Sequence, residues 1–275
     1  MIFEQAFMAL PEFLTGTPFQ RYQFEGTVVT AFAMAVLQEL NSRNVPNPVS
    51  LLRSEVEYPV DPAKRADLHI DLRSLGLIND SLKSYGYFEN NWLEAKFCRL
   101  GATGTPIVSP LTSTFLLLKD LIRLCALVPD SLLPGNPSDC GRYLLHAYQS
   151  TPNQYFVFNR NQHSRRTERA WINKLLKSGG QEIQIVDLSQ ERTKTFKKEV
   201  GNTGGLIKVE ASLTNLVHSS SQSTDDVYHI VLTRIDDFKI SVGRRWFKRE
   251  GGVMSESMNG FGLLMPRLVN HILTG

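Results

Sequence analysis

The chain has 275 residues, of which 42% are hydrophobic and 21% charged, with a net charge of +3. This is ordinary globular composition, and the three cysteines are too widely spaced for a disulfide framework or a zinc site. No apolar run approaches the roughly 18 residues of a membrane span, and the N-terminus lacks the basic segment of a signal peptide, so we expect a cytoplasmic protein that contacts no membrane.

Hydrophobic spacing predicts a helix over residues 18–43, in which Val28, Phe32 and Val36 recur at helical intervals. Alternation and turn residues predict the next elements: strands over 51–60, 65–72 and 91–97, a helix over 112–129, and strands over 141–149 and 154–160. A basic helix over 164–178, strands over 181–189, 205–213 and 226–235, a polar loop over 219–226 and a short helix over 266–273 follow. This order favours a single α/β domain over residues 1–275, a central mixed β-sheet flanked by helices.

Two predicted strands bring charged side chains to one face of the sheet. In RADLHIDL, residues 65–72, Asp67 points away from the face of Leu68, and in NWLEAKF, residues 91–97, Glu94 and Lys96 share a face with Trp92. If these strands pair as an antiparallel hairpin, Asp67 and Glu94 meet across about 4.5–5.5 Å. Paired carboxylates suit Mg²⁺, which polarises a phosphoryl oxygen, and a lysine beside them orients or deprotonates the attacking water.

These residues resemble the PD-(D/E)xK motif of the restriction-endonuclease-like nucleases. Asp67 corresponds to the first acid, Glu94 to the second and Lys96 to the lysine, although Ala66 stands where the family has proline. Glu25 in QFEGTVVTAF resembles a helix glutamate that many members add to the metal cluster. The resemblance covers about residues 20–150. It implies a restriction-endonuclease-like core, Mg²⁺-dependent hydrolysis of double-stranded DNA and, as in type II restriction enzymes, a homodimer.

Other interpretations of the same residues stay open. Asp71 is an alternative to Asp67 as metal ligand, and Glu94 and Lys96 are alternatively a structural ion pair. Asp237 and Lys239 form a second acid-x-lysine match, which a charged hairpin end also explains. Two further basic side chains, on the helix that follows the motif, either reach phosphates or form a solvated face: Lys119 and Arg123.

Basic side chains gather in two later segments, and we expect them to hold the DNA backbone. They are Arg165, Arg166, Arg169, Arg244, Arg245 and Lys248. Residues 151–275 are therefore expected to extend the sheet and to contribute DNA contacts. Two other functions fit the sequence: an antiviral-defence or DNA-repair nuclease without palindromic specificity, and a catalytically inert nucleic-acid-binding module.

Overall fold

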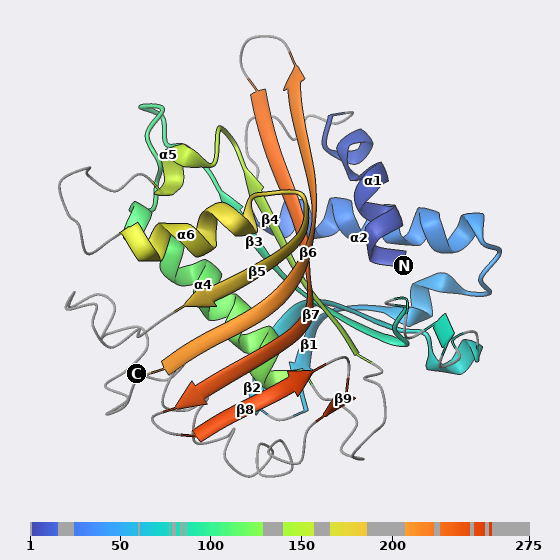
Figure 1. Cartoon of the computed structure of the whole chain (residues 1–275). Coiled ribbons are helices and arrows are strands. Elements are labelled where there is room, and N and C mark those ends of the chain that lie inside the picture. The colour runs from blue at the N-terminus through green and yellow to red at the C-terminus, as the bar shows by residue number, and fades with distance from the viewer. Residues whose placement is uncertain are drawn as a thin grey trace.

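In the computed structural model, helices cover both faces of one mixed β-sheet (Figure 1). The structure describes residues 2–15, 25–59, 61–76, 78, 81–82, 85, 87–128, 140–156, 166–185, 207–222, 226–242, 245–250 and 253–254. The expected α/β class is confirmed. No helix within these ranges is long and apolar enough to cross a membrane.

The main path of the sheet runs in the order β1-β2-β3-β4-β7-β6-β5. Its strands are β1 (Leu52–Tyr58), β2 (Asp61–Asp71), β3 (Asn90–Cys98), β4 (Cys140–Tyr148), β5 (Gly179–Ile185), β6 (Ile207–Gln222) and β7 (Asp226–Val242). Only the β3–β4 pair on this path is parallel. Two short strands extend from β7: β8 (Arg245–Glu250) and β9 (Val253–Met254).

Helices α1 (Ile2–Thr15) and α2 (Glu25–Ser42) lie on one face of the sheet, where the rings of Phe3 and Phe32 meet edge to face at 5.3 Å. Helices α4 (Pro110–Leu127), α5 (Asn153–Phe156) and α6 (Arg166–Leu175) lie on the other face. Two short 3₁₀ helices complete the described elements: η2 (Pro48–Leu51) and η3 (Arg73–Leu75). The three layers bury one hydrophobic cluster on each face of the sheet, which fixes α2 and α4 on opposite sides of β3.

Helix α4 begins where its sequence dictates. The Ser109 side chain accepts a hydrogen bond from the Thr112 amide, and Pro110, which has no amide to satisfy, occupies the first turn. Leu117, Leu121 and Leu124 then bury one stripe of the helix against the sheet. Because this stripe packs against the sheet, Asp120 and Arg123 of α4 lie close to β3.

Two predicted elements are wrong. Residues 153–156 form helix α5 and not the start of a strand, because a turn after Pro152 lets Tyr155 and Phe156 pack against Tyr148. The predicted loop over 219–226 is also wrong, since β6 continues to Gln222 and pairs with a β7 that begins at Asp226. Backbone pairing along this hairpin outweighs the polar side chains of the segment. The helix predicted over 266–273 lies outside the described residues.

The apolar side chains of β1 and β2 change faces at one position. On β1, Leu52 packs on the α1–α2 side, whereas Val56 packs on the α4 side. On β2, Ala66 lies on the α4 side and Leu68 on the α1–α2 side. Regular alternation would keep each pair on one face. Glu55, whose φ of 52° is in the left-handed region, lies between Leu52 and Val56, and the local twist that it introduces accounts for the switch.

This geometry predicts that substitution of Glu55 lowers the stability of the protein more than other substitutions on the exposed side of β1 do. Glu55→Val should lower the free energy of unfolding by about 1–2 kcal/mol, because a β-branched residue is strongly disfavoured at positive φ. Ser54→Val is the matched control: it is exposed on the same strand and should change stability by less than about 0.5 kcal/mol. Urea unfolding measures both, and equal effects of the two substitutions would contradict the left-handed conformation.

Candidate functional site

The β2–β3 ladder sets the distance between the two predicted acids. Its antiparallel register ends at the pair of Leu68 and Leu93, and Asp67 and Glu94 are the next residues on the two strands. The Asp67 Oδ2 atom accepts a hydrogen bond of 2.6 Å from the Ala95 amide, which fixes this carboxylate against β3. The predicted antiparallel hairpin is therefore confirmed.

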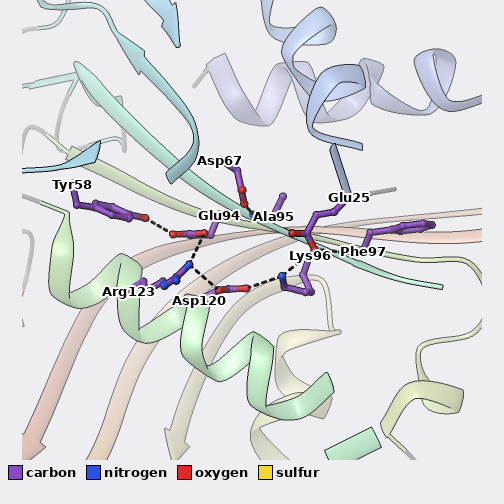
Figure 2. A network of polar contacts seen from close by, with 9 residues as sticks. All are labelled: Glu25, Tyr58, Asp67, Glu94, Ala95, Lys96, Phe97, Asp120 and Arg123. Carbon is purple, nitrogen blue, oxygen red and sulfur yellow. Dashed lines mark hydrogen bonds and ion pairs between the residues drawn. The ribbon is translucent and has the colours of Figure 1, made fainter. Parts of the chain in front are cut away.

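Glu25 reaches the same place from the start of α2. Its Oε2 atom lies 2.9 Å from Lys96 Nζ and accepts a hydrogen bond of 3.3 Å from the Phe97 amide. The four residues predicted to form the site, on α2, β2 and β3, thus belong to one local constellation (Figure 2). Phe97 itself packs toward α1 and α2, as alternation predicts.

Helix α4 contributes two residues that the motif does not contain. Asp120 Oδ2 lies 3.5 Å from Lys96 Nζ, and Arg123 Nη1 lies 3.6 Å from Glu94 Oε2 and 3.8 Å from Asp120 Oδ1. On the other side of Glu94, Tyr58 donates a hydrogen bond of 2.6 Å to its Oε1 atom. Figure 2 shows these contacts as a chain from Tyr58 to Glu25.

These contacts decide the position of Arg123. It was expected either to reach phosphates or to lie on a solvated face, and instead it is largely buried against two carboxylates.

The sequence carries a signal for Asp120: it falls three residues after Leu117 and four before Leu124, on the apolar stripe of α4. A carboxylate at such a position is rare without a partner.

The network carries more negative than positive charge. Four carboxylates, those of Glu25, Asp67, Glu94 and Asp120, share two cations, Lys96 and Arg123, which leaves an excess of two negative charges when all are ionised. Burial, followed by the charges of its acidic neighbours, raises the pKa of Glu94 well above its usual value. Burial also raises the pKa of Asp120.

The same environment shifts the pKa values of Asp67 and Lys96. Burial raises the pKa of Asp67 from 3.8 to about 6, partly opposed by its hydrogen bond from the Ala95 amide. Burial lowers the pKa of Lys96, but the carboxylates of Asp120 and Glu25 outweigh burial and raise it above its usual value. Lys96 is therefore an ammonium ion at neutral pH in this arrangement.

The alternative residues lie elsewhere. The Asp71 carboxylate is bound by Arg73 at 2.6 Å, and this partner lowers the pKa of Asp71. The second acid-x-lysine match lies on β7, where Lys239 is 4.0 Å from Glu210 on β6. The sequence alternatives are thus separated in space from the network around Lys96.

The structure does not test the predicted DNA-contacting residues. Arg165 and Arg244 lie outside the described residues. The backbones of Arg166, Arg169, Arg245 and Lys248 belong to α6 and β8, but their side chains are outside the described part of the chain.

The donor set of the network suits a divalent cation bound by few protein ligands. Among the described residues, no group of three or more His, Cys, Asp or Glu side chains is arranged to hold a metal. Mg²⁺ at phosphoryl-transfer sites needs fewer, because one or two carboxylates act together with waters and substrate phosphates. Asp67 and Glu94 supply two carboxylates close enough for the charge of Asp67 to raise the pKa of Glu94. The surplus negative charge favours a cation here.

Comparison with models of protein families, with curated proteins and with solved structures gives no match for this chain. Functional inference therefore depends on the geometry and charge of the site.

The raised pKa of Asp67 predicts how stability depends on pH. In the unfolded chain Asp67 ionises near its usual pKa of 3.8, whereas in the folded chain it ionises only near 6. The free energy of unfolding of the wild type should therefore fall, relative to that of an Asp67→Asn variant, as pH rises from about 4 to about 7. We expect Asp67→Asn to be more stable than the wild type at neutral pH, with the difference vanishing near pH 4.

Asp71→Asn is the matched control for this measurement, because Arg73 lowers the pKa of Asp71. Stability contributed by a lowered pKa is present at neutral pH and lost on acidification, so this variant should be less stable than the wild type at pH 7. Urea unfolding across this pH range measures both. A neutral-pH loss of stability in Asp67→Asn would contradict the burial of an ionised Asp67.

Proposed function

We propose that the protein is a Mg²⁺-dependent endonuclease of the PD-(D/E)xK type that hydrolyses phosphodiester bonds of DNA. One observation carries the proposal: the Asp67 carboxylate is bound to the Ala95 amide of β3, between Glu94 and Lys96, and Glu25 reaches Lys96 from the preceding helix. A structural ion pair needs one acid for Lys96. This network holds a surplus of carboxylates in a largely buried position, which is costly to the fold and suits the binding of a divalent cation.

The order of elements supports the same proposal. Helix α2, strands β1, β2 and β3, helix α4 and strand β4 follow one another, and the four strands are neighbours in a mixed sheet with helices on both faces. The resemblance in sequence implies this kind of core, with the first acid on one strand and the acid-x-lysine motif on the next. The sequence motif and the topology therefore favour the same residues independently.

Each residue has a distinct role in this proposal. Asp67 and Glu94, with Glu25, would hold Mg²⁺, which when bound polarises a phosphoryl oxygen and acidifies a water. Lys96 donates hydrogen bonds to the attacking water and offsets negative charge that develops on the phosphate. Its raised pKa keeps it protonated, so its contribution is electrostatic and positional, and deprotonation of the water falls to another group.

Double-stranded DNA is the proposed substrate, and a homodimer would present one site to each strand, as in type II restriction enzymes. The basic segments at 165–169 and 244–248 would supply sequence-independent phosphate contacts. A nuclease of antiviral defence or DNA repair would use the same site without palindromic specificity. The pattern of DNA fragments separates these two roles.

Plasmid cleavage tests the proposal. With Mg²⁺, wild-type protein should cut supercoiled DNA, and EDTA should abolish cutting. Glu94→Gln, which keeps an acceptor for Tyr58, and Lys96→Met should each lower the rate by at least about a hundredfold, because each removes a charge that acts on the reacting phosphate. Lys239→Met is the matched control on the second acid-x-lysine motif and should cut at the wild-type rate.

The fragments also discriminate between roles: discrete bands on several DNAs indicate restriction, and smeared products indicate a defence or repair nuclease. Cutting that survives in Lys96→Met but is lost in Lys239→Met would move the site to β7. An absence of cutting together with equal DNA binding in Mg²⁺ and in EDTA would favour an inert binding module and reject the nuclease.

A further inference from the structure

The Lys96 ammonium lies between carboxylates from helices on opposite faces of the sheet. Glu25 Oε2 is 2.9 Å from Nζ, a charge-assisted hydrogen bond. Asp120 Oδ2 is 3.5 Å from the same nitrogen, close enough for an ion pair but making no hydrogen bond. Figure 2 shows Lys96 between these two acids.

The two carboxylates differ in how freely they can move. The Glu25 side chain is 40% exposed and belongs to the first residue of α2. The Asp120 side chain is 5% exposed and lies in the interior of α4, between buried leucines. Glu25 can therefore turn toward another partner, while Asp120 stays where the packing of α4 holds it.

Asp120 also has an unused oxygen. Its Oδ2 atom is buried and accepts no hydrogen bond within the described structure, a condition that destabilises the folded state, most of all for a charged group. Arg123 does not remove this deficit, because its nearest contact to Asp120 is 3.8 Å and reaches the other oxygen, Oδ1. An ammonium carries three donors, so Lys96 can satisfy Asp120 Oδ2 with a small shift.

We propose that Asp120 is a positioning residue that receives Lys96 when Glu25 turns to a divalent cation. Lys96 then has two places: bound to Glu25 before the cation enters, and hydrogen-bonded to Asp120 afterwards. In the second place the charge of the ammonium is balanced by a buried acid, and Glu25 is released as a ligand. This inference rests on the proposed function, because it gives Glu25 a cation to bind.

Mn²⁺ binding to the DNA-free protein tests this coupling without any activity measurement. Mn²⁺ takes the same oxygen ligands as Mg²⁺, and its free concentration is read from its electron paramagnetic resonance signal. Four proteins form the cycle: wild type, Asp120→Asn, Lys96→Met and the double variant. Glu39→Gln, which removes an acid paired with Arg43 on the outer surface of α2, is the charge-matched control and should bind like the wild type.

With Lys96 present, Asp120→Asn should weaken Mn²⁺ binding about tenfold, because the displaced ammonium loses a charged hydrogen-bond partner. In the Lys96→Met background the same substitution should weaken binding by about twofold or less, which reflects only the charge removed. This difference between backgrounds is not expected of a residue that only supports the fold.

Four results overturn the inference. An equal loss of Mn²⁺ affinity in both backgrounds means that Asp120 acts by long-range charge alone. An unchanged affinity in Asp120→Asn means that Asp120 has no part in binding. In either case, Mn²⁺ binding by the wild type is still consistent with the proposed function. A wild-type protein that binds no Mn²⁺ and cuts no DNA rejects both. If Asp120→Asn does not fold, Asp120→Glu replaces it. That variant keeps the carboxylate and should bind Mn²⁺ within about twofold of wild type, and a larger loss in a folded protein rejects the role.

Discussion

The arrangement depends on a surplus of acidic side chains that α2, β2, β3 and α4 bring together around Lys96 and Arg123. A carboxylate removed from water must be paired or neutralised, and Glu94 and Asp120 are both almost fully buried. Arg123 and Lys96 balance two of the four acids in the network, and burial, followed by the charges of neighbouring acids, raises the pKa values of Glu94 and Asp67. A fold selected for stability alone would gain by replacing these groups with apolar ones. Their presence together is the strongest physical reason to assign a function to this site.

Each layer of the fold supplies one part of the network. The pairing of β2 with β3 brings Asp67 to the site, where its carboxylate accepts a hydrogen bond from the Ala95 amide. The helices contribute from opposite faces of the sheet, with Glu25 at the start of α2 and a buried acid in the interior of α4. The site therefore requires the three-layer architecture and not a single hairpin.

Alternation predicted that β2 and β3 pair, because one face of each strand is apolar. It did not predict the change of face between Ala66 and Leu68, next to the site. The contribution of α4 was not predictable in the same way, because a sequence does not say which strand a helix crosses. For Asp120 the sequence gives part of the answer. An acid on the apolar stripe of a helix indicates that it has a buried partner, but not which residue that partner is. Local propensity failed at 154–156, where a turn after Pro152 and the burial of Tyr155 outweigh the aromatic residues that favour a strand.

If the acids on β2 and β3 form a divalent-cation site, a crystal soaked in Mn²⁺ and measured at a wavelength where manganese scatters anomalously should reveal the ion. We expect an anomalous peak about 2 Å from carboxylate oxygens of both Asp67 and Glu94, with Lys96 no longer bound to Glu25. The same peak should be missing from crystals of Glu94→Gln. A wild-type map with no peak beside these two acids, or with its strongest peak at Asp237 on β7, would contradict the account.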